Sequence, residues 1–168
     1  MFRCAAVLLS CLLALGPQLT SAASPQVFKD PPLPGTKPDA VEFLSPAQVT
    51  VTARRAAEID LHFRIADGLH INSHHPADKT LIPTRLAVVE APGLNVTAVD
   101  FPPGADFSPQ FAPKEKLNVY TGEFVLHAHL TALAGEHTLV GGLHYQACDA
   151  NACMPPHTIP LSVTVVAQ

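Results

Sequence analysis

The 168-residue sequence contains no tryptophan, and only 6% of its residues are aromatic and 14% charged. Ten Lys and Arg residues stand against fourteen Asp and Glu residues, which gives a formal net charge of −4. The chain therefore lacks the excess of basic residues that dominates affinity for nucleic acids, and we expect no nucleic-acid partner. Because 48% of the residues are hydrophobic, a disordered polyelectrolyte is excluded, and one or at most two compact domains are expected.

Long apolar runs are missing beyond the first part of the chain. Residues 1–23 combine a basic start at Arg3, an apolar run over residues 5–15 and small residues before a cleavage position after Ala22 or Ala23. This layout is typical of a secretory signal peptide. The apolar run is too short to span a bilayer comfortably, and no later window reaches roughly 18 uninterrupted apolar residues. We therefore expect an exported protein whose mature chain has no membrane span.

Cysteine is scarce in the mature chain. Cleavage of the signal peptide removes Cys4 and Cys11 and leaves Cys148 and Cys153. Exported proteins enter compartments in which disulfides form and persist, so the two remaining cysteines are able to form a disulfide. A lipid-modified Cys11 is the less favoured alternative, because it would leave an unusually short apolar region before it.

Proline, by contrast, is abundant. The seventeen prolines are about twice the average usage and argue against a bundle of long helices. Residues 24–46 are rich in proline and hold few apolar side chains, which predicts an extended and largely unpaired leader. Within this leader, residues 41–44 are apolar enough to dock on the domain that follows.

From residue 47 to residue 168 the hydrophobic pattern has a period of two. Apolar side chains from Ile59 to Ile65 alternate with polar ones, as in a half-buried strand. Further strands are expected at residues 49–52, 84–90, 94–100, 119–131, 137–147 and 158–166. Turn sequences such as Asp67-Gly68 separate them. About seven short strands predict an all-β domain with the architecture of an immunoglobulin-like β-sandwich.

Cys148 and Cys153 lie in a turn-like segment between two of these strands. Asp149 and Asn151 favour a turn, and if the segment folds back the Cα atoms can approach the usual disulfide range of about 4.4–6.8 Å. Closing a loop of about six residues stabilises a chain by only roughly 2 kcal/mol. A redox-active pair is therefore favoured over a structural disulfide, and metal ligation is a third alternative.

Several segments around the cysteine pair resemble the family of N-terminal periplasmic domains of the thiol–disulfide interchange reductase DsbD. The matching segments are residues 64–72, 82–84, 119–122, 145–148, 153–156 and 159–161. The specific part is a Tyr-Gln-x-Cys start at Tyr145 with a second cysteine followed by two prolines. The resemblance covers roughly residues 40–166. It implies an immunoglobulin-like domain in the periplasm that passes reducing equivalents from a membrane-embedded module to acceptor proteins, many of them thioredoxin-like.

This resemblance implies roles for individual residues. Cys148 and Cys153 would be the exchanging pair, with Cys153 facing the partner and Cys148 resolving the mixed disulfide. Residues 107–116 match a cap loop whose aromatic side chain shields the sulfurs, with Phe111 as the first candidate and Phe107 as the second. The protein would be a component of a protein-disulfide reductase system and would need no cofactor.

The expected partners are thioredoxin-like periplasmic proteins and a membrane electron donor. Because the chain ends at Gln168, just past the last expected strand, we expect this donor to be a separate protein. The two rival hypotheses are an immunoglobulin-like binding or adaptor module with a structural disulfide, and a periplasmic metal-binding protein.

The surroundings of the sulfurs are expected to differ from those in the family. The loop between the cysteines is one residue shorter than in the best-known members, and two tyrosine positions of those members fall on His70 and Asn72. His144 is predicted to share a strand face with Gln146 and Cys148, where an imidazolium would favour a thiolate. A surface histidine without such a role is the alternative.

The nine histidines also raise the possibility of a metal site. His70, His74 and His75 fall in one expected loop, and His127 and His129 occupy alternate positions on one strand face. No fixed ligand spacing is present, however. We therefore interpret these residues as surface histidines and expect no metal ligands among them.

Overall fold

The computed structural model describes residues 39–89, 91–109 and 116–168. These residues form β-strands joined by turns and loops, and no helix occurs among them. Accordingly, this part of the chain holds no helix long and apolar enough to cross a membrane. The expected all-β fold class is confirmed.

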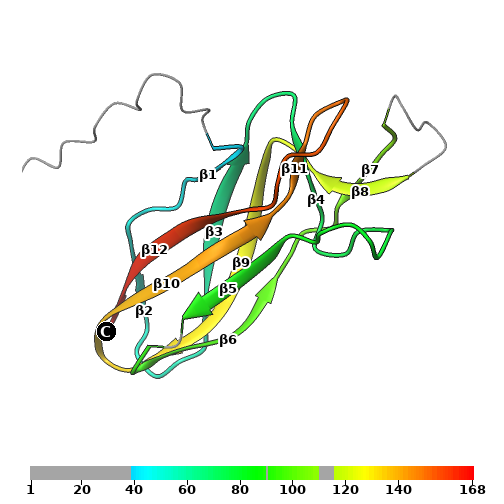
Figure 1. Ribbon diagram of the computed structural model, residues 1–168. Helices are drawn as coiled ribbons and strands as arrows, with labels where there is room; N and C mark the ends of the chain where they lie inside the picture. Colours follow the sequence, from blue (N-terminus) through cyan, green and yellow to red (C-terminus); the bar gives the residue numbers. More distant parts are fainter. Residues whose placement is uncertain (1–38, 90, 110–115) are drawn as a thin grey trace, which may run out of the picture. The chain divides into compact units, whose positions relative to one another are not determined.

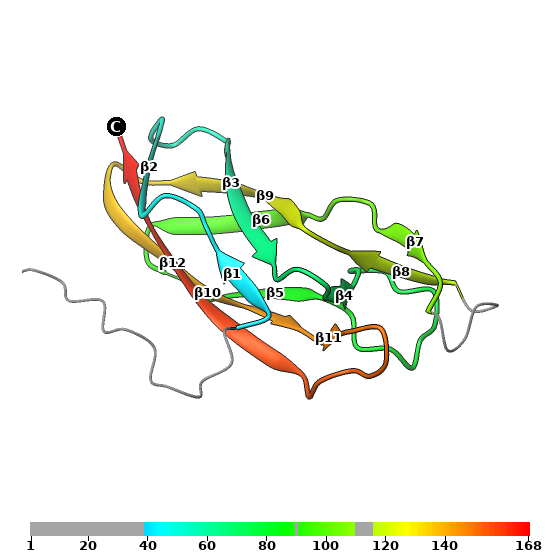
Figure 2. The ribbon, with the colours of Figure 1, turned by 90° about the horizontal axis from the view of Figure 1, so that it is seen from above.

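Two four-stranded sheets form the body of the sandwich and lie as two layers (Figures 1 and 2). The first sheet has the order β1-β3-β9-β6, with β1 at Val41–Phe43, β3 at Ala57–Ile65, β9 at Glu123–Ala132 and β6 at Leu94–Asp100. The second has the order β2-β12-β10-β5, with β2 at Gln48–Val51, β12 at His157–Ala167, β10 at Gly135–Tyr145 and β5 at Arg85–Val89. Neighbouring strands are antiparallel except β2 and β12, which run parallel.

A third, smaller sheet lies at one end of the sandwich (Figure 2). Its order is β11-β4-β8-β7, with β11 at Ala147–Cys148, β4 at His70–Asn72, β8 at Leu117–Tyr120 and β7 at Ala105–Phe107. Strand β11 directly follows β10 of the second sheet, and β8 directly precedes β9 of the first. The third sheet therefore connects to both layers at the end of the molecule that carries Cys148.

The core follows from the period-two pattern. Leu61 and Phe63 of β3 are fully buried, and they face a layer that includes the buried side chains of Leu139, Leu143 and Val163. Burying each such side chain contributes roughly 1.5–3 kcal/mol, which offsets the conformational entropy lost on folding. A slip of one residue in any of these strands would turn its apolar set toward solvent, so the core fixes the strand register.

The structure corrects one boundary of the expected domain. Val41–Phe43, placed by the sequence analysis in a largely unpaired leader, forms β1 and pairs with β3. The reason is the spacing of its apolar side chains: Val41 is only 1% exposed, and the Phe43 ring lies 5.2 Å from that of Phe63. The expected signal peptide and the expected leader up to residue 38 lie outside the described residues.

Two consecutive glycines, Gly141 and Gly142, lie where β10 closely approaches its neighbouring strands in the second sheet. Gly141 and Gly142 lie in β10 between β5 and β12, and a Cβ atom at Gly141 would come within 2.5 Å of the carbonyl oxygen of Ala87 in β5. Real Cβ atoms do not approach backbone oxygens so closely. A side chain at this position therefore requires the backbone of β5 to move.

We expect Gly141→Ala to lower the free energy of unfolding by about 1–3 kcal/mol, the usual cost of overpacking a well-packed region. Urea denaturation monitored by circular dichroism measures the change. Ser162→Ala, at an exposed position of the neighbouring β12, should change it by less than about 0.5 kcal/mol. Equal urea midpoints for Gly141→Ala and the unsubstituted protein would contradict the argument.

Candidate functional site

Cys148 and Cys153 form a disulfide at a tight hairpin turn. Two backbone hydrogen bonds flank the pair: the Asp149 N–H donates to the Ala152 oxygen at 2.9 Å, and the Met154 N–H donates to the Ala147 oxygen at 2.8 Å. The cysteines thus occupy a non-hydrogen-bonded position, where antiparallel backbones approach each other most closely. Their Cα atoms are 3.9 Å apart, which is closer than the range expected from the sequence.

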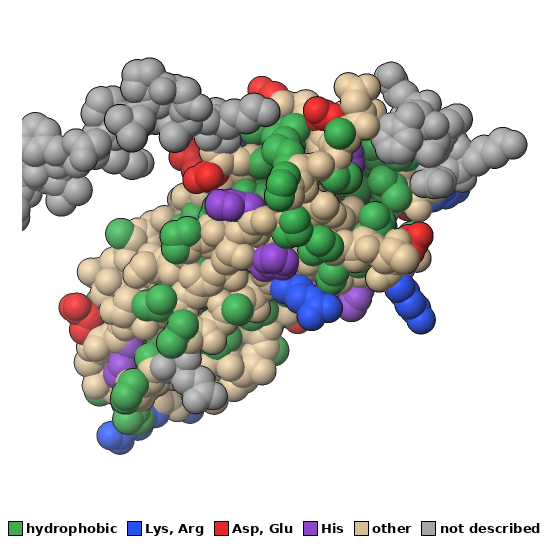
Figure 3. Space-filling view, viewed as in Figure 1, with side chains coloured by type: hydrophobic (Ala, Val, Ile, Leu, Met, Phe, Trp, Pro, Cys, Tyr) green, Lys and Arg blue, Asp and Glu red, His purple; other side chains and the backbone are tan. Residues whose placement is uncertain are grey.

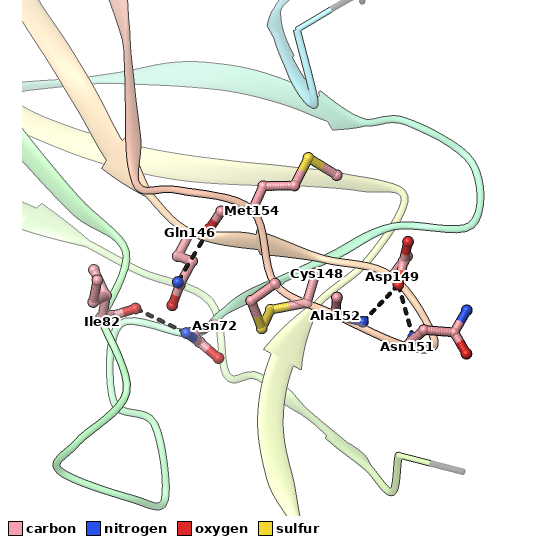
Figure 4. The surroundings of a disulfide bond; sticks show 9 residues. Asn72, Ile82, Gln146, Cys148, Asp149, Asn151, Ala152 and Met154 are labelled. Atoms are coloured by element: carbon pink, nitrogen blue, oxygen red, sulfur yellow. Dashed lines mark hydrogen bonds between the residues drawn. A yellow bond between two sulfur atoms is a disulfide. The ribbon is translucent and has the colours of Figure 1, made fainter. Parts of the chain in front are cut away.

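The side chain of Asp149 holds this turn closed. Its Oδ1 atom accepts hydrogen bonds from the backbone N–H groups of Asn151 at 2.7 Å and Ala152 at 2.8 Å (Figure 4). At the base of the hairpin, Gln146 Nε2 donates to the Met154 oxygen at 3.1 Å. The two bonds to Oδ1 explain why an aspartate stands at position 149, since a short polar side chain can stabilise a turn by accepting from backbone N–H groups just after it.

The two cysteines differ in exposure. Cys148 is 4% exposed, whereas Cys153 is exposed. The cause is their position: Cys148 belongs to β11, which pairs with β4, while Cys153 lies on the outgoing arm of the hairpin in an isolated bridge to Cys148. Solvent therefore reaches the residue Cys153 more readily than Cys148.

His70 lies directly opposite Cys148 in the pairing of β4 with β11. Side chains of directly paired residues project from the same face of a sheet, so the imidazole and the sulfur of Cys148 are neighbours. His70 is only 5% exposed, and its ring centroid lies 4.3 Å from that of Phe107 in β7. The structure thus brings together three expected site residues. Phe111 lies outside the described residues.

Asn72 lies on β4, the same strand as His70, but its contacts are structural. It is 1% exposed, its side-chain Nδ2 atom donates to the backbone oxygen of Ile82 at 3.0 Å (Figure 4), and its backbone oxygen accepts from the Thr84 hydroxyl at 2.5 Å. These bonds fasten the loop between residues 73 and 84 to β4. Asn72 therefore supports the strand that covers Cys148.

His144 lies in β10 and Cys148 in β11, and Gln146 separates the two strands. His144 Nδ1 lies 3.0 Å from the Thr158 hydroxyl oxygen on β12. A thiolate-stabilising role for His144 receives no support from this contact.

The expected histidine cluster after the Asp-Gly turn is divided. The His70 ring faces Phe107. The His74 ring instead stacks on Phe101, with ring centroids 3.9 Å apart, and its Nδ1 atom lies 2.9 Å from the backbone oxygen of Thr84. Figure 3 shows histidine side chains spread over the visible face rather than gathered at one place. Of the loop histidines, His70 therefore lies opposite Cys148, whereas the His74 ring packs against Phe101 and against the His75 ring, 4.5 Å away.

A pocket of about 450 Å³ opens beside the disulfide hairpin. The residues that line it include His70 and Phe107, the turn residues Gly68 and Gly122, and Ala150 from the loop between the cysteines. Ala150 thus brings the loop to the wall of a space large enough for a few side chains of a partner. The sequence analysis missed this pocket because its walls come from four separate segments.

Burial lowers the pKa of the His70 imidazole below its ordinary value of 6.5, and the negative charge of Asp149 opposes this effect only in part. His70 is therefore neutral near pH 7. A neutral ring beside Cys148 places no positive charge against that sulfur.

This burial predicts a pH dependence of stability. Because the unfolded chain protonates His70 near pH 6.5 and the folded domain only at lower pH, the stability contribution is present above about pH 6.5 and is lost as the pH falls through the lowered pKa. Relative to wild type, His70→Phe should flatten the decline in unfolding temperature between about pH 7 and pH 5. His62→Gln, at an exposed position, should leave the decline unchanged. A constant difference between His70→Phe and wild type across this range would refute the assignment.

Comparison with known protein families gives a match over most of the chain. The model of the family described as thiol:disulfide interchange protein DsbD, N-terminal, matches residues 40–164. The DsbD N-terminal domain of Neisseria meningitidis in the reduced form is 20% identical, with a TM-score of 0.44 over 67% of this chain and 80% of that chain. A search of curated proteins gives no match.

Two further solved structures are similar. The N-terminal periplasmic domain of ScsB from Proteus mirabilis is 15% identical, with a TM-score of 0.49 over 73% of this chain and 44% of that chain. A complex between the DsbD and PilB N-terminal domains of Neisseria meningitidis gives 23% identity and a TM-score of 0.41, over 62% of this chain and 73% of the matched chain.

Proposed function

The chain belongs to the family of DsbD N-terminal domains, whose function is thiol–disulfide interchange, and we propose that it exchanges electrons with protein partners through Cys148 and Cys153. The function expected from the sequence is thereby confirmed at the level of the family. The observation that carries the residue assignment is the disulfide on a local hairpin in which one cysteine is buried and the other exposed. A disulfide built only for stability would normally connect distant strands.

The proposed reaction consists of two exchange steps. In the reduced domain, the Cys153 thiolate attacks one sulfur of a partner's disulfide, that disulfide breaks, and the second partner sulfur leaves as a thiolate. The Cys148 thiolate then attacks the Cys153 sulfur and releases the first partner sulfur, also as a thiolate. Two electrons pass to the partner, and the Cys148–Cys153 disulfide forms. The reverse sequence reduces the domain.

Exposure and proximity support these roles. The thiolate is the attacking species, and an exposed thiol ionises more readily than one buried in apolar surroundings. Cys148 is covered by β4 beside neutral His70, yet the hairpin holds its Cα atom 3.9 Å from that of Cys153. The second step is therefore intramolecular and needs no rearrangement of the chain.

We also propose the setting in which the domain acts. The protein is exported to the periplasm, and residues 1–23 are removed as a signal peptide. Its partners are thioredoxin-like periplasmic proteins and a membrane electron donor. The matched DsbD N-terminal domain of Neisseria meningitidis forms a complex with the PilB N-terminal domain. That complex supports a protein partner here, and the pocket beside the hairpin offers it a place to dock.

Single-cysteine variants test the two roles. Cys148→Ser should form mixed disulfides through Cys153 and accumulate them, because the resolving thiol is missing. Cys153→Ser should form at least about tenfold less, because the remaining thiol is buried. Incubation of each reduced variant with oxidised glutathione, followed by intact-mass spectrometry, measures the adduct directly. A periplasmic extract then identifies trapped proteins.

Two outcomes count against this proposal. Equal adduct formation by the two variants would remove the assignment of roles. A wild-type disulfide with a reduction potential below about −300 mV, together with no adduct from either variant, would favour a structural disulfide. Titration against defined ratios of reduced and oxidised glutathione supplies the potential.

The cap is tested at Phe107. We expect Phe107→Ala to raise the rate at which a bulky maleimide alkylates the reduced thiols by about threefold or more, since the ring that packs on His70 would be gone. The loss of stability should stay below the roughly 3–5 kcal/mol of a fully buried Phe, because Phe107 is only partly buried. Phe101→Ala, which removes a ring stacked on His74, is the matched control. An unchanged rate in Phe107→Ala would leave Phe111 as the cap, or no cap.

A further inference from the structure

A row of acidic and imidazole side chains lies on the exposed face of the first sheet. Glu58 and Asp60 belong to β3, His127 and His129 to β9, and Asp100 to β6. In the strand register Glu58 lies opposite His129, while Asp60 and Asp100 both lie opposite His127. Side chains of directly paired residues share a face, so all five project to the same side of the sheet.

The imidazoles converge on one carboxylate. His127 Nδ1 lies 3.5 Å from Glu58 Oε1, and His129 Nδ1 lies 3.6 Å from Glu58 Oε2. His127 Nδ1 also lies 2.7 Å from Asp60 Oδ1. The candidate ligand atoms of Glu58, Asp60 and His127 are all within 4.8 Å of one another. One imidazole nitrogen and two carboxylates thus form a close group, and His129 approaches the other oxygen of the Glu58 carboxylate from outside that group.

These separations suit a small divalent ion. Bonds of about 2.0–2.2 Å in tetrahedral geometry hold ligand atoms roughly 3.3–3.6 Å apart. The distances from His127 to Oε1 and from His129 to Oε2 of Glu58, 3.5 and 3.6 Å, lie in that range. For both imidazoles to share one ion, the Glu58 carboxylate has to rotate and the His127–Asp60 distance of 2.7 Å has to lengthen. The side chains are half exposed, between 36% and 51%, so small rotations meet little resistance from packing.

Asp100 completes the arrangement. Its Oδ2 atom lies 2.8 Å from Nε2 of His129, the ring nitrogen that does not face Glu58. A carboxylate on the distal nitrogen fixes the orientation and tautomer of a metal-binding imidazole and raises its basicity. Asp100 is thus a positioning residue for His129.

We propose that Glu58, Asp60, His127 and His129 bind one divalent transition-metal ion of the zinc class, with the Nδ1 atoms of both imidazoles as ligands. Imidazole with carboxylate is a donor set that suits such ions, whereas hard ions such as Ca²⁺ require oxygen ligands alone. This proposal replaces the expectation from the sequence that His127 and His129 are surface histidines that bind no metal. It does not depend on the disulfide, which lies in the third sheet.

The test uses the mature protein with its disulfide intact, so that Cys148 and Cys153 cannot bind metal. The protein is first dialysed against a chelator and then against buffer. Isothermal titration calorimetry with ZnCl₂ should then show one binding site for Zn²⁺. His127→Ala and His129→Ala should each weaken Zn²⁺ binding at least tenfold, and Asp100→Asn should weaken it about 10–100-fold as an orienting partner does. CaCl₂ should give no comparable binding.

Two controls make the result specific. His62→Gln removes another exposed histidine from the same face of β3 and should bind Zn²⁺ as the wild type does. Co²⁺ should give the wild type a visible absorption band that is lost in His127→Ala, and thermal unfolding of each apo-variant shows whether it is folded. Absence of Zn²⁺ binding by the wild type would overturn the proposal. So would unchanged affinity in the folded His127→Ala and His129→Ala variants, or an equal loss in His62→Gln.

Discussion

The short pairing of β11 with β4 is the interaction on which the candidate redox site depends. It joins only two residues of each strand, yet it buries Cys148, places His70 opposite the sulfur and brings Phe107 over the imidazole. On the outgoing arm of the hairpin, Cys153 is exposed. The two cysteines of one disulfide thus differ in exposure, which suits the two proposed steps of disulfide exchange.

The long strands could be predicted from sequence because burial alone dictates their pattern. β3, β10 and β12 alternate over many residues, and the expected ranges differ from the observed ones by a few residues. β4, β7 and β11 have two or three residues each, too few for a period to appear. The expected strand at 119–131 is divided into β8 and β9 because Gly122 adopts a positive φ of 61°.

In the candidate site, features that depend on neighbouring residues could be predicted from the sequence, and features that depend on distant strands could not. The turn between the cysteines could be predicted because Asp149 bonds to its own neighbours in the chain. The difference in exposure could not, since it results from β4, which lies more than seventy residues earlier in the sequence. The convergence of two imidazoles on Glu58 likewise depends on the register between β3 and β9. A pattern within one strand indicates which residues share a face but not what they meet on the next strand.

Strand β9 connects the two proposed activities through a single constraint. Its inward side chains, including Phe124, Leu126 and Leu130, are buried in the core, and the alternation of faces then directs His127 and His129 outward. A slip of one residue would bury both imidazoles and expose the leucines, at a cost of roughly 1.5–3 kcal/mol for each apolar side chain. The same core therefore fixes the metal ligands on the sheet face and, through β8 and β4, the cover over Cys148.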